Sequence, residues 1–207
     1  MKIITISREF GSGGRELGKR LADALGFDYY DREIITSIAE NRGMDEDYVA
    51  KTLEDHGWRD VPLTFRHTFT PVVSPHTVRT DLLLEQTKVI REIAKAGRDC
   101  VIVGRNADVL LRKYEPFNLF VCADMGAKIR RCVERAPEDE KLSQKELERK
   151  IRSIDKNRAR TRDIITGSRW GERESYHLTV NTTGWEIKEL TLAVVEFVAR
   201  WFGRFEQ

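Results

Sequence analysis

The stretch REFGSGGRELGKRLADAL, residues 8–25, joins a glycine-rich turn to a helical pattern. Immediately before it, Ile3 to Ile6 form a short β-branched run that is typical of a buried parallel strand. From Gly14 onward the apolar residues recur at helical spacing, and Gly26 marks the expected end of the helix. The order strand, glycine loop, helix is the context that a phosphate-binding loop requires.

Backbone N–H groups in such a turn, together with the N-terminus of the following helix, form a cradle for anions. The predicted phosphate-binding residues are Gly11, Ser12, Gly13, Gly14, Arg15 and Glu16. The standard motif G-x-x-x-x-G-K-[ST] is not met, because Arg15 stands in the place of the lysine and Glu16 in that of the Ser/Thr. Three interpretations therefore stay open: a working cradle with an arginine, a degenerate cradle, or an ordinary glycine turn.

Short apolar strands alternate with amphipathic helices along the whole chain, which predicts an α/β fold with a parallel sheet. Strands are expected at residues 3–6, 27–30, 100–103, 119–123 and 178–180, and helices at 14–25, 33–41, 44–53, 78–96, 127–135, 145–166 and 187–202. We expect one domain over residues 1–207, with an insertion at about 43–96 and a mobile segment at about 145–173.

Composition excludes several classes of protein. The chain is 40% hydrophobic and 34% charged with a net charge of +2, so a strongly basic nucleic-acid binder is not indicated. No run approaches the roughly 20 apolar residues that span a bilayer. The sequence predicts a cytoplasmic protein that acts on small molecules, without membrane or nucleic-acid partners.

Charged residues follow the predicted strands, where ligands of parallel sheets bind. Asp31 and Arg32 follow the second strand, and Arg105 follows the third. We predict that these three bind the acceptor, Arg105 as a bidentate fork for phosphate. Asp31 or Glu16 can approach Mg²⁺, although no metal ligand is firmly assigned. The alternative for each residue is a helix cap or a surface ion pair.

A basic helix is expected late in the chain. Residues 149–162 contain seven Lys or Arg residues and one acid, Asp155. Arg158 and Arg162 are spaced i,i+4 and share a helix face, which can close over a transferring phosphate. We predict catalytic roles for these two arginines and for Arg15. The alternative is a solvated helix face.

Four segments resemble the cytidylate kinase-like family of P-loop proteins: SREFGSGGR (7–15), FDYYD (27–31), VIVGR (101–105) and DKNRARTRDIITGSRWGERESYHLTVNTT (155–183). The resemblance leaves out residues of about 43–90, and the chain departs from established cytidylate kinases at the loop lysine. It implies a P-loop kinase-like five-stranded parallel sheet flanked by helices, with an acceptor-binding insertion and an Arg-rich lid. It also implies that ATP with Mg²⁺ donates its γ-phosphate to a nucleoside monophosphate such as CMP.

Other functions remain open. The chain can be a nucleotide-binding module without transfer activity, or a kinase of another small hydroxyl compound with Asp31 as general base. A monophosphate acceptor needs paired cations in its pocket, whereas a hydroxyl acceptor needs a carboxylate. Nucleic-acid binding through residues 149–162 ranks last.

Aromatic residues near the C-terminus also have two interpretations. Phe197, Trp201, Phe202 and Phe205 either pack on the sheet or form a homodimer contact. Trp170 either flanks the adenine or anchors packing. Phe65, Arg66, His67 and Phe69 either line an acceptor pocket or contact a second copy.

Overall fold

A computed structural model describes residues 1–54, 75–136 and 142–204. Its centre is a sheet of five parallel strands in the order β2-β3-β1-β4-β5. The strands are β1 (Ile3–Arg8), β2 (Asp28–Tyr30), β3 (Cys100–Val103), β4 (Phe117–Cys122) and β5 (Leu178–Asn181). The α/β fold with a five-stranded parallel sheet is therefore confirmed.

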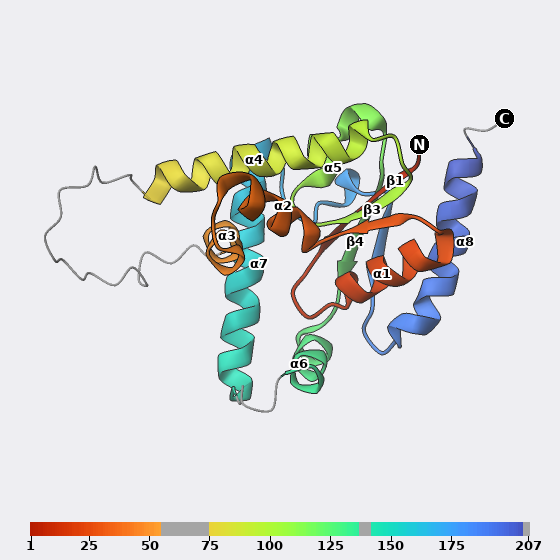
Figure 1. Cartoon of the computed structure of the whole chain (residues 1–207). Helices are drawn as coiled ribbons and strands as arrows, with labels where there is room; N and C mark the ends of the chain where they lie inside the picture. The colour runs from red at the N-terminus through yellow and green to blue at the C-terminus, as the bar shows by residue number, and fades with distance from the viewer. Residues whose placement is uncertain (55–74, 137–141, 205–207) are drawn as a thin grey trace, which may run out of the picture.

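Two layers of helices cover the sheet (Figure 1). The helices are α1 (Gly14–Leu25), α2 (Glu33–Arg42), α3 (Glu46–Glu54), α4 (Pro75–Lys95), α5 (Ala107–Leu110), α6 (Met125–Glu134), α7 (Gln144–Thr166) and α8 (Ile187–Gly203). Alternate residues of a strand point to opposite faces, so Ile4 and Ile6 pack with α1 and α8, while Ile3 packs with α2 and α4.

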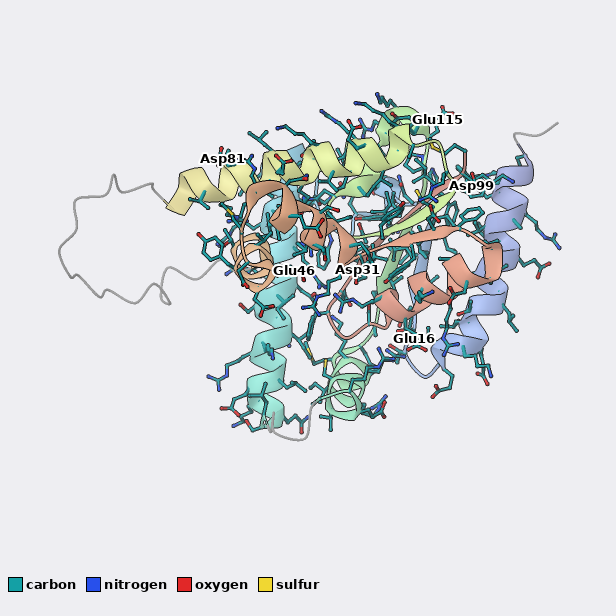
Figure 2. The ribbon with its side chains drawn as sticks, in the orientation of Figure 1. Glu16, Asp31, Glu46, Asp81, Asp99 and Glu115 are labelled. Carbon is teal, nitrogen blue, oxygen red and sulfur yellow. The ribbon has the colours of Figure 1, made fainter. Side chains whose placement is uncertain are left out.

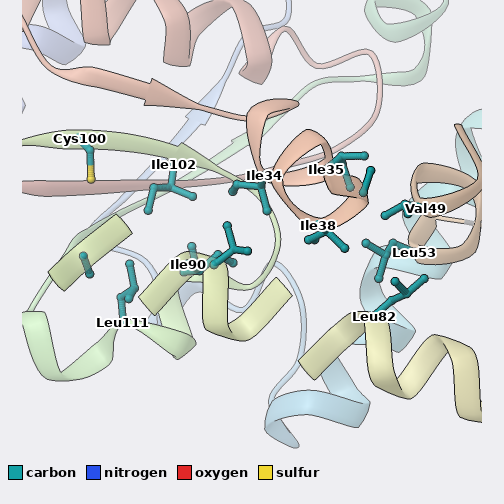
Figure 3. Close-up of a cluster of buried hydrophobic side chains, with 14 of the residues drawn as sticks. Ile34, Ile35, Ile38, Val49, Leu53, Leu82, Ile90, Cys100, Ile102 and Leu111 are labelled. Carbon is teal, nitrogen blue, oxygen red and sulfur yellow. The ribbon is translucent and has the colours of Figure 1, made fainter. Parts of the chain in front are cut away.

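The face of the sheet beneath α4 carries a core of its own. Figure 3 shows Ile34, Ile35 and Ile38 of α2 packed with side chains of α3 and α4 such as Val49 and Leu82. Helices α3 and α4 lie within the predicted insertion, and this core attaches them to α2 and, through Ile102, to β3.

The sequence predictions give the bounds of most helices and strands to within a few residues of those in the structure. They miss α5 and two short 3-10 helices, Arg112–Tyr114 and Arg173–Ser175, because elements of three or four residues are too short to show an apolar period. Four residues of the predicted insertion lie outside the described residues: Phe65, Arg66, His67 and Phe69.

The C-terminal aromatic residues pack on the end of the sheet. The Phe117 ring lies 5.2 Å from that of Trp201 and 6.0 Å from that of Phe197, centroid to centroid. Phe202 is buried in the same cluster, and Phe205 lies outside the described residues. In the part of the chain that is described, no helix is long and apolar enough to cross a membrane.

Parallel strands bring several loops to one edge of the sheet. The glycine loop follows β1, Asp31 follows β2, and Gly104 to Asn106 follow β3. Helix α7 runs beside α3 and α6 at the same end of the molecule (Figure 1). The candidate site lies at this edge.

Candidate functional site

The glycine loop has two left-handed glycines and leads directly into α1. Gly11 and Gly13 have φ values of 75° and 83°, a left-handed conformation that glycine adopts at little cost. Gly13 precedes the first turn of α1 and no side chain caps this helix end. The amides of that turn lack acceptors within the helix, which is the arrangement that an anion cradle requires.

Hydrogen bonds tie the loop to β5 and α7. The buried Ser12 hydroxyl donates to the Glu9 carbonyl at 2.8 Å, and the Thr182 hydroxyl donates to the Ser12 carbonyl at 2.7 Å. The Phe10 amide donates to Asp155 Oδ1 at 2.7 Å. These bonds hold the loop from both sides.

A buried lysine lies beneath the loop. Lys128 of α6 is 7% exposed, and its Nζ is 2.7 Å from Glu9 Oε2 and 3.2 Å from Asp155 Oδ2. Burial raises the pKa of Asp155 despite the opposing hydrogen bond from the Phe10 amide and the charge of Lys128. The two carboxylates compensate the Lys128 charge, so this lysine supports the loop from below.

Arg15 does not point into the loop. Its Nε lies 2.5 Å from Asp31 Oδ2, and its side chain is 65% exposed. Asp31 Oδ1 also faces Arg8, whose Nη2 is 3.6 Å away. Figure 2 shows Asp31 beside the start of α1, which also carries Glu16. The structure therefore brings Arg15 and Asp31 together, with Arg8 as a third member.

Arg158 and Arg162 of α7 were predicted to share one role, but they contact different parts of the molecule. Arg158 Nη1 donates to the Arg8 carbonyl at 3.0 Å, and its guanidinium lies over the Phe10 ring. Arg162 is 2% exposed, and its Nη1 lies 2.5 Å from Asp108 Oδ2 of α5. Arg158 thus lies at the loop, whereas Arg162 joins α7 to α5.

The loop after β3 has an unusual backbone. Gly104, Arg105 and Asn106 all have positive φ, at 75°, 59° and 54°. Consecutive left-handed residues other than glycine are uncommon and cluster at functional sites. Arg32 differs, because its side chain is 73% exposed and its Nη2 lies 3.8 Å from Asp47. The predicted acceptor residues are therefore not gathered in one place.

Two cavities meet at this edge. The larger, about 690 Å³, is lined by the loop, α6 and the start of α7. The smaller, about 100 Å³, is lined by Ser7, Arg8, Leu53, Leu83, Gln86, Gly104, Arg105, Asn106, Ile154, Asn157, Arg158, Thr161 and Trp170. Arg8 and Arg158 line both cavities. We call these the loop cavity and the β3 cavity.

Trp170 belongs to the β3 cavity and packs edge-on against Phe120, with centroids 5.4 Å apart. This contact fits the packing interpretation of Trp170.

The carboxylates named for a metal ion both have arginine partners. Glu16 pairs with Arg20 at 2.8 Å and with Arg135, and Asp31 pairs with Arg15. Within the described ranges, no group of three or more His, Cys, Asp or Glu residues is placed to hold a metal. Both carboxylates are thus engaged by arginine in this arrangement.

The sequence profile of the cytidylate kinase-like family matches residues 3–184. The chain belongs to the cytidylate kinase-like family. The cytidylate kinase of Haloarcula marismortui is 27% identical over 198 residues, which are 94% of this chain and 89% of that protein. The family membership confirms the resemblance on the loop, on residues 101–105 and on the late basic segment.

Solved structures show the same fold. An uncharacterized protein from Eubacterium ventriosum has a TM-score of 0.70 at 22% identity and covers 96% of this chain and 99% of its own. Shikimate kinase from Acinetobacter baumannii has a TM-score of 0.54 at 14% identity, covering 97% of this chain and 94% of its own. A gluconokinase from Sinorhizobium meliloti scores 0.51 at 14% identity, covering 99% and 95%. Family and fold together support a nucleotide or small-molecule kinase.

Sequence reasoning missed Arg8 and Lys128. Arg8 ends a strand directly before the glycine loop, a position that the rule for ligand sites in parallel sheets singles out. Lys128 has no comparable signal, because only the packing of α6 against Gly11 brings it beneath the loop.

Proposed function

We propose that the protein transfers the γ-phosphoryl group of ATP to a nucleoside monophosphate, with CMP as the first candidate. The main support for this proposal is the set of residues that line the β3 cavity. It contains Arg8, Arg105 and Arg158, and none of the described residues that line it is a carboxylate. Paired cations suit a phosphate acceptor, whereas a hydroxyl acceptor calls for a base.

The loop cavity suits the donor. Its volume of about 690 Å³ is within the usual range for small-molecule pockets. Gly11, Ser12, Gly13, Gly14, Arg15 and Glu16 form the cradle for the donor phosphates in this proposal. Leu142 and Leu147 offer apolar surface to the base. Magnesium would enter with ATP and would offset part of the phosphate charge.

Phosphoryl transfer requires that the two substrates are held in position and that positive charge offsets the negative charge of the phosphates. An oxygen of the acceptor monophosphate forms a bond to the γ-phosphorus while the bond from that phosphorus to the β,γ-bridging oxygen breaks. The electron pair of the broken bond stays on ADP, so the products are ADP and a nucleoside diphosphate. Arg158 lies where the two cavities meet and is suited to stabilise the group in transit.

Residues 145–173 act as the lid in this proposal. Helix α7 carries Arg158 and is attached to α5 through the buried pair of Arg162 with Asp108. We therefore propose that Arg162 positions α7, and that Arg158 contacts the phosphates. The predicted insertion supplies Leu53, Leu83 and Gln86 to the β3 cavity, on the acceptor side.

The test is ADP release from Mg-ATP with CMP, dCMP, UMP, AMP and GMP offered singly. We compare Arg158→Ala with Arg160→Ala, since Arg160 lies on the same helix but is exposed. We expect release that depends on one monophosphate and falls about a thousandfold in Arg158→Ala, with a small change in Arg160→Ala.

Other results would assign the alternatives. Release with shikimate or gluconate, but with no monophosphate, would identify a kinase of a hydroxyl compound. ATP binding without transfer to any acceptor would identify a nucleotide-binding module. Absence of ATP binding would contradict the proposal altogether.

A further inference from the structure

The side chain of Arg8 occupies the space that a side chain at residue 14 would take. A Cβ placed on Gly14 would lie 2.6 Å from Arg8 Cβ and 3.0 Å from Arg8 Cγ. Real Cβ atoms do not approach other atoms so closely, so any side chain at residue 14 would clash with Arg8. A side chain at residue 14 would start where Arg8 leaves the strand, so the two side chains compete for the same space.

The guanidinium of Arg8 ends where the two cavities meet. A Cβ on Gly104 would overlap it, so the end of the Arg8 side chain lies against the loop after β3. Arg8 is 10% exposed and lines both the loop cavity and the β3 cavity. A group passing from one cavity to the other would pass this guanidinium.

Arg15 lies elsewhere. It lines the loop cavity and an open groove beside Tyr29 and Arg32, but it is not among the residues that line the β3 cavity. Its Nε is held by Asp31 at 2.5 Å. Arg15 is thus close to the donor side of the site and remote from the acceptor side.

Positive charge exceeds negative charge around Arg8. Burial lowers the pKa of Arg8 to about 9, with a further contribution from Arg158, whereas Asp31 acts in the opposite direction. Arg105 and Arg15 add to the positive field. Arg8 remains charged at pH 7, and an anion between these arginines would relieve their repulsion.

We propose that Arg8, at the end of β1, supplies the cation that a phosphate loop normally takes from a lysine on its helix. The proposal deepens the proposed function and rests on it for the identity of the transferring group. Arg15 then acts with Asp31 to position Arg8. This accounts for the departure from the standard motif. The positive charge is retained, but the residue that carries it lies on the strand and not on the helix.

Binding of inorganic pyrophosphate, ATP and AMP, measured by calorimetry, tests this assignment. We compare Arg8→Met with Arg15→Met, and with Lys19→Met as the control, because Lys19 is exposed on α1 and pairs with Asp23. Arg8→Met should weaken pyrophosphate and ATP roughly tenfold to a hundredfold and AMP less, since a charged hydrogen bond is lost. Arg15→Met should lose less affinity for pyrophosphate and ATP than Arg8→Met, and Lys19→Met should bind both as tightly as the native chain does.

The exchange Arg8→Gly/Gly14→Lys is the decisive variant. It removes the side chain that Gly14 accommodates and places a cation at residue 14 in its stead. We expect pyrophosphate and ATP affinity above that of Arg8→Gly alone, with folding checked by circular dichroism. Recovery would show that the lost affinity of Arg8→Gly was not a failure to fold.

The outcomes separate this inference from the proposed function. Pyrophosphate binding that depends on Arg8, without phosphoryl transfer to any monophosphate, would support the role proposed for Arg8 and contradict the kinase proposal. Full transfer in a folded Arg8→Met, or a larger loss in Arg15→Met than in Arg8→Met, would overturn the inference and leave the kinase proposal standing. A native chain that binds neither pyrophosphate nor ATP would overturn both.

Discussion

Asp31 lies between two arginines from different elements. Its Oδ2 is 2.5 Å from Arg15 Nε on α1, and its Oδ1 is 3.6 Å from Arg8 Nη2 on β1. The carboxylate is 5% exposed, so water screens these charges poorly. Sequence reasoning assigned Asp31 to the acceptor or to a metal. From its contacts we expect Asp31 to act as the counter-ion that orients the arginines at the edge of the sheet.

Asp31→Asn should leave the buried Arg8 charge without its nearest carboxylate. Loss of one partner of a buried pair costs about 3 kcal/mol, which urea unfolding would measure. Pyrophosphate should raise the melting temperature of Asp31→Asn more than that of the native chain, because the anion replaces the lost charge. In contrast, Asp23→Asn alters an exposed pair and should cost under about 1 kcal/mol. A stable Asp31→Asn with no response to pyrophosphate would contradict this role.

Arg162 and Asp108 should behave as a structural pair. Arg162→Met leaves the buried Asp108 carboxylate uncompensated and should destabilise the fold by about 3–5 kcal/mol. The double variant Arg162→Met/Asp108→Leu should recover much of that loss, since no buried charge then remains. Unfolding free energies of the two single variants and the double variant decide the matter. A double variant as unstable as the sum of the single variants would show that the two residues act separately.

Gly18 should be needed for the packing of α1 on the sheet. A Cβ there would lie 2.9 Å from both Ile6 Cδ1 and Val103 Cγ2. Gly18→Ala should therefore cost about 1–3 kcal/mol, despite the better helix propensity of alanine. Adding Ile6→Val removes one of the clashing methyl groups and should restore part of the stability in thermal unfolding. Gly203→Ala, where nothing lies within 4 Å, is the control and should not destabilise.

Glu16 should contribute a stability that depends on pH. Burial acts to raise its pKa, but the hydrogen bonds and charges of Arg20 and Arg135 outweigh it and hold the pKa below the ordinary 4.5. The folded state then binds fewer protons than the unfolded state, so the contribution is present above pH 4.5 and is lost as pH falls through the lowered pKa. Glu16→Gln should lower the melting temperature at pH 7 and have progressively less effect in acid.

The control for this prediction is Glu196→Gln. Its carboxylate pairs with Arg200, but both side chains are exposed, so the variant should change the melting temperature little at any pH. A Glu16→Gln effect that stays constant from pH 7 into acid would contradict the ion-pair explanation.

Local pattern was sufficient to predict the longer elements of the fold. The apolar run of residues 100–103 matches β3, and the helical spacing after Gly14 matches α1 with its end at Gly26. Both follow from the alternation of the strand and the 3.6-residue period of the helix, which depend on neighbours in sequence. The strand-loop-helix order placed the glycine loop at the carboxyl edge of the sheet for the same reason.

The roles of the arginines depend on contacts between distant residues. Arg158 and Arg162 are equivalent in spacing, yet one meets Arg8, 150 residues away, and the other meets Asp108 on α5. Counting along the motif indicated Arg15, because a motif records position in sequence and not the direction of a side chain. The sequence by itself determined the fold class, the strand-loop-helix order around the glycines and the supply of cations. Only the tertiary structure decided which cations lie between the two cavities, since long flexible side chains take their direction from the packing around them.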